Sequence, residues 1–441
     1  MMFWVELIIL FSMLLIGARR GGPFLGMVGG LGMAILVFGA HLTPANPPIN
    51  VILIISTVIL AASTMQVAGG MDYLVGLAET ILRKNPKNIT FLAPVVVYLF
   101  CFMSGTGYVA FSLLPVIAEV ARESGIRPER PLSITAAASQ QAVIASPISA
   151  ATAVMLGVFL PLNIGLLDIL RVCIPATFIG VLAGALYASR MGKDLDKDSE
   201  YLERVAKGEV PPLEKKKFNE KYFTREAKLS VLLFLLGALA IVLFGTFPSL
   251  RPVLKYAGKL QLLPMPETIE IVMLLISTVM VILCKVNVGK ISDSSVFKSG
   301  MVGVLVVFGT AWMSDTMVSA NSTLIQSSIK STVMSYPWMF LFAVCVIDIL
   351  IASQSVSAAA MMPLGVLLGV PAPLLIAMYP AVSSHFFLPT STIHVTSVSL
   401  DRTKTTKIGK YVLNHSFMMP GFVTMSVAII VGYLLAELFT F

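Results

Sequence analysis

A short polar stretch, Ser104-Gly105-Thr106-Gly107-Tyr108, interrupts an otherwise apolar run from about residue 89 to residue 120. A helix needs about 20 residues to cross a bilayer, so this run is too long for one span and too short for two spans with a turn. Basic residues flank it on both sides: Arg83, Lys84 and Lys87 before it, and Arg122, Arg127 and Arg130 after it. Because positive charge marks the cytoplasmic face, we predict a re-entrant hairpin that leaves on the side it entered. Such a hairpin is tolerated only where it packs in protein or lines a wet cavity.

The composition places the chain in a membrane. Its 441 residues are 57% hydrophobic and 12% charged, with a mean hydropathy of +0.89, whereas soluble domains carry about 25% charged residues. We therefore predict an all-α polytopic membrane protein. The first apolar segment, residues 2–17, has no small-residue cleavage site and is interpreted as a retained span.

Charge and cysteine content argue against several other classes. The net charge of +8 lies mostly in loops between spans, which the positive-inside bias explains without a nucleic-acid partner. The four cysteines fall inside apolar segments, and the sequence contains no CxxC pair or Cys/His cluster. No disulfide, metal or cofactor is expected.

Residues 1–189 are predicted to form a first membrane repeat. Its broken span is interrupted at Ser146-Pro147, because proline removes a backbone donor and clashes with the preceding turn. The elements in order are spans at about 3–17, 23–40 and 51–69, an amphipathic surface helix at 71–83, the hairpin at 89–120, a broken span at 132–160 and a closing span at 169–189.

Residues 190–228 differ from the rest in being dense in Lys, Asp and Glu, and we interpret them as a cytoplasmic linker. Residues 229–441 then repeat the pattern of the first half. The elements in order are spans at about 229–245, 269–284 and 296–313, a partly polar helix at 321–333, a hairpin at 338–370 interrupted at Ser353–Ser355, a stretch at 374–400 broken at Leu388-Pro389-Thr390, and a last span at 412–438.

The two halves are expected to have opposite orientations. Arg19 and Arg20 precede an uncharged loop on the other side of the next span, which places these arginines in the cytoplasm and both termini in the periplasm. Ten spans and two hairpins in two inverted repeats are typical of secondary transporters. Arg251, Lys255 and Lys259 would then lie in an outside loop, against the bias.

In carriers of this plan the substrate binds near the midplane, between interrupted helices. The N-termini of half-helices offer unpaired N–H groups and partial positive charge, which suits carboxylates. Small residues that merely permit close helix packing are the alternative explanation. The candidate substrate-binding residues are Ser104, Gly105, Thr106, Gly107, Tyr108, Gln140, Gln141, Ser146, Pro147, Ser149, Ser353, Gln354, Ser355, Pro389, Thr390, Ser391 and Thr392.

Asp348 is the one acidic residue deep in a predicted membrane segment. An intramembrane carboxylate suggests proton or cation coupling, although Asp348 could equally face the polar side of the bundle. Asp168 and Asp315 lie near span ends and are expected at the interface. The three histidines of the last hundred residues are interpreted as hydrogen-bonded structural residues: His385, His394 and His415.

Several motifs resemble the anaerobic C4-dicarboxylate transporter (Dcu) family, with DcuA and DcuB as its types. The resemblance extends in order over nearly the whole chain. It is carried by Gly105-Thr106-Gly107, Leu114-Pro115-Val116-Ile117, Arg127-Pro128-Glu129-Arg130-Pro131, Ser139-Gln140-Gln141, Ala145-Ser146-Pro147-Ile148-Ser149, the 192–198 stretch, Ser299-Gly300-Met301, Ala311-Trp312-Met313, Tyr336-Pro337-Trp338, Ser353-Gln354, Leu388-Pro389-Thr390 and Ile408-Gly409-Lys410 to Asn414-His415-Ser416.

The resemblance implies a bacterial inner-membrane carrier of fumarate, malate, succinate and aspartate, which exchanges fumarate for succinate in anaerobic respiration or takes up substrate with a cation. It also implies an elevator-type movement, a homodimer and interaction with a dicarboxylate sensor kinase. Two positions depart from the family. Tyr108 stands where members carry His, and Thr390-Ser391-Thr392-Ile393-His394 stands where relatives more often have Thr-Tyr-Pro.

Other functions remain as alternatives. A carrier of another small organic anion or of an acidic amino acid, coupled to a cation, would use the same architecture. A channel fits the hairpins but not the repeated broken spans. A membrane enzyme would need an activated nucleophile, a metal cluster or paired carboxylates, and the sequence shows none of these patterns.

Overall fold

The computed structural model describes residues 2–20, 23–211, 223–256, 259–321, 335–351, 353–388, 391–409 and 414–439. Within these residues, eight helices are long and apolar enough to cross a membrane. The prediction of an all-α polytopic membrane protein is confirmed. The predicted helix at 321–333 lies almost wholly outside the described residues.

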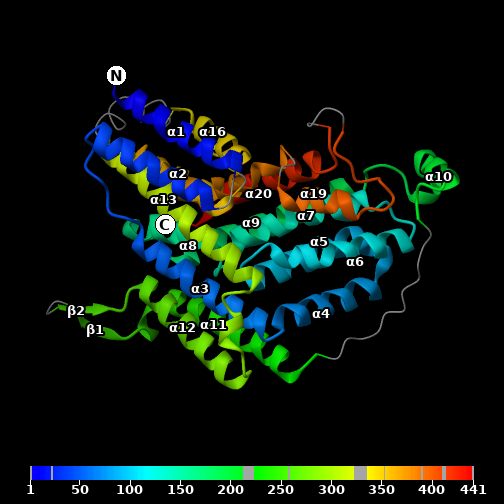
Figure 1. The fold of residues 1–441 in the computed structure, drawn as a ribbon, viewed down its shortest axis with the longest axis horizontal. Coiled ribbons are helices and arrows are strands. Elements are labelled where there is room, and N and C mark those ends of the chain that lie inside the picture. Colours follow the sequence, from blue (N-terminus) through cyan, green and yellow to red (C-terminus); the bar gives the residue numbers. More distant parts are fainter. Residues whose placement is uncertain are drawn as a thin grey trace.

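The first half contains the predicted elements in the predicted order (Figure 1). The elements are α1 (Met2–Arg20), α2 (Pro23–Ala34) with the π-helical turn η1 (Ile35–Gly39), α3 (Ile49–Val67), α4 (Gly70–Lys84), η2 (Pro86–Asn88), α5 (Ile89–Ser104), α6 (Tyr108–Glu123), α7 (Glu129–Ala145), α8 (Ala150–Phe159), η3 (Leu160–Leu162) and α9 (Leu166–Ala188).

The linker contributes two short helices, and the second half follows. The elements are η4 (Leu195–Lys197), α10 (Ser199–Ala206), α11 (Arg225–Thr246), η5 (Pro248–Leu250), β1 (Val253–Tyr256), β2 (Lys259–Leu262), α12 (Met265–Leu283), η6 (Val288–Lys290), α13 (Ser295–Ala320), α16 (Pro337–Ile351), α17 (Gln354–Leu367), α18 (Ala372–Met378), η8 (Tyr379–Phe386), α19 (Thr392–Leu400) and α20 (Met418–Leu438).

Local chemistry explains the turn between α5 and α6. Gly105 has φ of +67°, and a Cβ there would lie 2.7 Å from the carbonyl oxygen of Ile148. Only glycine adopts this backbone conformation without strain while leaving room for a neighbouring chain. The hairpin therefore reverses at the stretch predicted from the sequence.

The break after α7 also has a local cause. Ser146 is extended, with ψ of 129°, and helix resumes only after Ser149. The hydroxyl oxygen of Ser149 accepts a hydrogen bond from the Thr152 backbone N–H at 3.1 Å, so Ser149 caps α8. Two half-helices thus replace one span.

The structure differs from the sequence-based boundaries at three places. The α-helix after the second hairpin ends at Met378, and the 3₁₀ segment η8 follows, because Pro380 has no N–H for α-helical bonding. The last helix begins at Met418 rather than near residue 412. The predicted outside loop near residue 255 forms the antiparallel pair β1–β2, in which Val253 faces Leu262.

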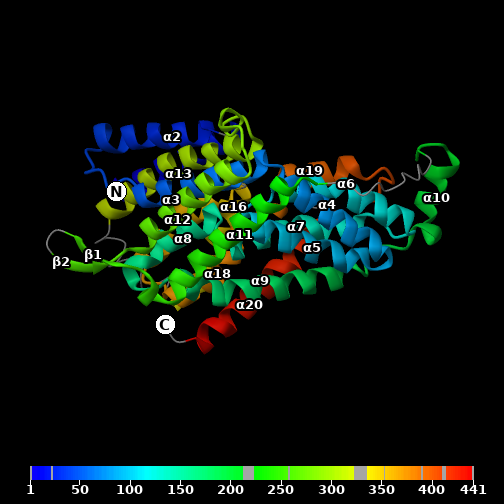
Figure 2. The ribbon, with the colours of Figure 1, turned by 90° about the horizontal axis from the view of Figure 1, so that it is seen from below.

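The two ends of the molecule carry different elements. α10 lies at one end, whereas β1–β2 lies at the opposite end and both chain termini lie toward it (Figures 1 and 2). Helix α2 packs on α13, α3 packs on α12, and α9 packs along α20. The α2–α13 contact is close because Gly26 and Gly309 face each other, and a Cβ on Gly309 would lie 2.0 Å from the Gly26 carbonyl oxygen.

Candidate binding cavity and its surroundings

A central cavity of about 320 Å³ lies where the four interruptions meet. Its lining comes from both halves of the chain, including the α5–α6 and α16–α17 turns and the starts of α8 and α19. The predicted residues that line it are Ser104, Gly105, Thr106, Gly107, Gln140, Ser149, Ser353, Gln354, Ser355, Ser391 and Thr392.

Three other predicted residues lie outside the cavity lining. Gln141 is 2% exposed and donates from Nε2 to the Ser383 hydroxyl at 2.7 Å. Ser146 donates from Oγ to the Phe102 carbonyl oxygen at 2.7 Å. Pro147 follows it in the break between α7 and α8. Gln141 and Ser146 therefore join segments that are distant in the sequence and do not line the cavity.

The remaining predicted residues cannot be placed around the cavity. Helix α6 begins at Tyr108, but the Tyr108 side chain lies outside the described part of the structure. Pro389 and Thr390 also lie outside it.

Four helix N-termini border the cavity. The residues that precede the first turns of α6, α8, α17 and α19 are Gly107, Ser149, Ser353 and Ser391, and all four line it. The first N–H groups of a helix have no carbonyl partner within that helix, and each N-terminus carries about half a positive charge. The arrangement suits an anion with more than one negative group.

An apolar wall, which the sequence did not predict as part of the site, closes one side of the cavity. Ile55, Val58 and Ile59 from α3 and Gly300 and Gly303 from α13 form most of it. No polar signal marks these residues in the sequence. Gly300 brings α13 close to α3, because a Cβ there would lie 2.6 Å from the Ile59 side chain.

A second cavity of about 640 Å³ lies along the same boundary. It is lined by α3 and α13 on one side and by α8 and α17 on the other, and Asp315 is its one charged residue among those described. Asp315, which was expected at the membrane interface, lies five residues before the end of α13 and lines this cavity. Asp168 lies at a helix end, where its carboxylate accepts from the Gly165 N–H at 2.8 Å.

His385 is the only titratable side chain among the described residues that line the central cavity. Its Nδ1 lies 3.0 Å from Asp348 Oδ2, and Asp348 is fully buried outside the cavity lining. His394 packs against Phe417, with 4.6 Å between ring centroids, and His415 Nε2 lies 3.2 Å from the Phe387 carbonyl oxygen. The hydrogen bond fits the structural interpretation of His415, whereas His394 is buried by ring packing and its Nδ1 has no hydrogen-bond partner among the described residues. Sequence reasoning did not predict that His385 lines the cavity.

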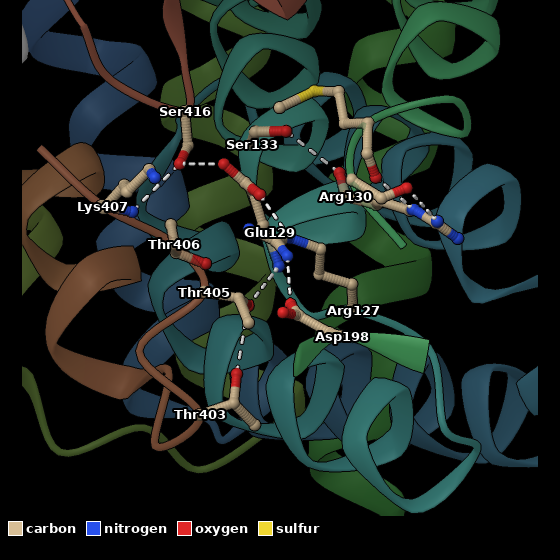
Figure 3. A network of polar contacts seen from close by, with 12 residues as sticks. Arg127, Glu129, Arg130, Ser133, Asp198, Thr403, Thr405, Thr406, Lys407 and Ser416 are labelled. Atoms are coloured by element: carbon tan, nitrogen blue, oxygen red, sulfur yellow. Dashed lines mark hydrogen bonds and ion pairs between the residues drawn. The ribbon is translucent and has the colours of Figure 1, made fainter. Parts of the chain in front are cut away.

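A buried ionic network surrounds the start of α7 (Figure 3). Glu129 is 6% exposed; it accepts from Arg127 Nε at 2.5 Å and from the Ser416 hydroxyl at 2.5 Å. Arg127 also pairs with Asp198 of the linker. The Glu129 backbone N–H donates to Thr405 at 3.3 Å. The network joins three segments that are far apart in the sequence.

Further contacts fix the first part of the linker. Arg130 pairs with Asp194 at 2.6 Å, and Arg122 donates to the Pro211 carbonyl oxygen. The segment interpreted as a linker thus contacts the end of α6 and the start of α7 through Asp194, Asp198 and Pro211. The charged residues of the linker did not predict these contacts, because a stretch of charged residues usually faces solvent.

The helices, the paired interruptions and the dipole-lined cavity define a multi-pass membrane transporter. A family model described as "Anaerobic c4-dicarboxylate membrane transporter" matches residues 2–440. This chain belongs to that family, and the resemblance predicted from its motifs is confirmed.

Relatives and solved structures agree with the assignment. The chain is 42% identical to the C4-dicarboxylate transporter DcuA of Wolinella succinogenes over 98% of this chain and 99% of that protein. It is 37% identical to the anaerobic C4-dicarboxylate transporter DcuB of Escherichia coli over the whole of both chains.

Two solved transporters have a similar fold. MtrF of Neisseria gonorrhoeae, described as one of a class of antimetabolite efflux pumps, matches with a TM-score of 0.54 and 13% identity over 91% of this chain and 84% of that chain. The YdaH transporter of Alcanivorax borkumensis matches with a TM-score of 0.56 and 15% identity over 87% of this chain and 84% of that one.

Proposed function

We propose that this protein carries C4-dicarboxylates (fumarate, malate, succinate and aspartate) across the bacterial inner membrane and exchanges fumarate for succinate. The observation that carries the proposal is the convergence of four helix N-termini on one cavity. No Lys or Arg is among the described residues that line it. Dipoles, N–H groups and hydroxyls would therefore bind two carboxylates without fixed cations.

We propose alternating access by an elevator-type movement of two inverted repeats, residues 1–189 and 229–441. The helix contacts support an equivalence of the two halves. If α1, α2 and α3 correspond to α11, α12 and α13, the contact of α2 with α13 corresponds to the contact of α12 with α3, and both contacts are present. The two cavities lie in succession between α3 with α13 and α8 with α17. Sliding of the hairpin-bearing part along this boundary would move the site from one side of the membrane to the other.

The proposed orientation places both termini in the periplasm and the 190–228 linker in the cytoplasm. The basic 122–130 segment lies beside the linker, as the positive-inside bias requires. We also propose that Asp348 takes part in proton or cation coupling, from its buried position outside the cavity lining. A homodimer and contact with a dicarboxylate sensor kinase are proposed by family analogy alone.

Counterflow tests the exchange. Proteoliposomes loaded with succinate should accumulate labelled fumarate or aspartate without an imposed ion gradient. Accumulation that requires an ion gradient would favour the alternative, a cation-coupled carrier of another organic anion or acidic amino acid. Absence of counterflow with every C4-dicarboxylate would overturn the proposed substrate class, and conductance far above carrier turnover would indicate a channel.

A further inference from the structure

The wall of the central cavity provides one group that can gain a positive charge. His385, on η8, is the sole titratable side chain among the described lining residues. Two carboxylates would enter a site to which the helix N-termini contribute dipoles and N–H groups. A proton on His385 would supply a full positive charge, which no other described lining residue provides.

Asp348 holds the His385 ring from the side away from the cavity. Its carboxylate accepts from the Ser357 hydroxyl at 2.9 Å and from the His385 backbone N–H at 2.9 Å, and it lies 3.0 Å from His385 Nδ1. With Nδ1–H donating to Asp348, the other ring nitrogen is an acceptor in the neutral ring and a donor in the protonated ring. The protonation state of Nε2 therefore decides whether the ring repels or binds a carboxylate.

We propose that His385 binds one proton together with each dicarboxylate, and that protonated Nε2–H donates to a substrate carboxylate while Asp348 positions the ring. The proton comes from water on the side where the substrate enters and leaves to water on the side of release. Exchange of two dicarboxylates then moves no net proton, whereas net uptake brings in one proton per substrate. The inference rests on the proposed function.

The surroundings leave few other groups for this role. On α16 the titratable groups are Asp348, which pairs with His385, and Cys345, which lies near Asp348 and Ser384. On α19, His394 lies with its ring centroid 6.2 Å from that of His385. Tyr379 lies on η8 itself. Helices α17 and α18 contain no charged residue, and the charged residues of α7, α9 and α20 lie near their ends: Glu129, Arg130, Asp168, Arg171 and Glu437.

Proton uptake on binding is the direct test. Calorimetric titration of fumarate into the purified protein near pH 7, in two buffers of different ionisation enthalpy, should show about one proton taken up per fumarate, since the proposed complex contains one more proton than the free protein and the carboxylates of fumarate stay ionised. Between about pH 7 and pH 8 the affinity should fall by up to tenfold. His385→Gln should bind fumarate with no proton uptake and little dependence on pH.

Three matched variants separate His385 from its neighbours. His394→Gln and His415→Gln should retain proton uptake. Asp348→Asn should lose most of it near pH 7 and regain it at lower pH, while His385 is still present. A merely structural role for Asp348 would change thermal stability but not the number of protons.

Three results would overturn the proposal. The first is fumarate binding to the wild type without proton uptake, which needs no variant to fold. The second is proton uptake that survives in His385→Gln, and the third is proton uptake that disappears in His394→Gln. If counterflow proceeds while no proton is taken up, the His385 proposal alone is wrong; if no C4-dicarboxylate binds, the proposed function fails with it.

Discussion

The Ser146 hydroxyl donates a hydrogen bond to the Phe102 carbonyl oxygen at 2.7 Å. This bond ties the break between α7 and α8 to the last turn of α5, so two interruptions of the first half are held in register. Ser146 is fully buried and is not part of the cavity lining. We therefore expect Ser146 to position the cavity wall, and the two substitutions below separate positioning from direct binding.

Ser146→Ala should lower stability and leave the substrate preference unchanged. Loss of a buried hydrogen bond that leaves a carbonyl oxygen without this donor costs about 1–3 kcal/mol. Thermal unfolding followed by size-exclusion fluorescence should show a lower midpoint. The ratio of fumarate to succinate affinities should stay as in the wild type, and a changed ratio at unchanged stability would place Ser146 in the binding site.

Thr106→Val should weaken fumarate binding about tenfold, because removing one hydroxyl contact costs about 1–1.5 kcal/mol. Thr106 lines the cavity, and valine keeps its shape. Thr57→Val is the matched control, since Thr57 bonds only within its own helix, to the Leu53 and Ile54 carbonyl oxygens, and lies outside the cavity lining. Equal effects of the two variants on affinity would contradict a binding role for Thr106.

Gly105→Ala should prevent normal folding of the hairpin. A left-handed residue with a Cβ costs about 1–2 kcal/mol, and this Cβ would also lie 2.7 Å from the Ile148 carbonyl oxygen. Gly125→Ala is the control, with φ of +71° but no atom within 4 Å of the added Cβ. The yield of folded protein should fall much further for Gly105→Ala, and similar yields would show that the contact with Ile148 does not matter.

Glu129→Gln should loosen the network that docks the linker. Breaking a buried ion pair by changing one partner costs about 3–5 kcal/mol, and Glu129 and Arg127 are largely buried. We expect a lower midpoint of thermal unfolding and faster proteolysis between residues 190 and 211. Lys207→Gln removes an exposed pair with Glu203 and should change stability by less than about 1 kcal/mol. Unchanged proteolysis of Glu129→Gln would show that other contacts hold the linker.

Local patterns predicted the helices and their interruptions well. The length of the apolar run and the glycine-rich stretch at Gly105 predicted the α5–α6 hairpin. Ser149, which lies just after the predicted break at Ser146-Pro147, caps α8 through its own side chain. These features depend on residues a few positions apart, so they can be inferred before the fold is known. The β1–β2 pair and the docked linker were not predicted, because no local pattern distinguished them from polar loops.

The sequence by itself determined the membrane class, the family, the order of elements and the polar interruptions that meet at the cavity. Only the tertiary structure decided which side chains face that cavity. Successive helix residues point about 100° apart, so Gln140 lines the cavity while Gln141 bonds Ser383, 242 positions away. Tertiary packing likewise buried Asp348 behind His385. Asp348 lies on α16, whereas its partners Ser357 and His385 lie on α17 and η8, and only the folded chain brings these three elements together.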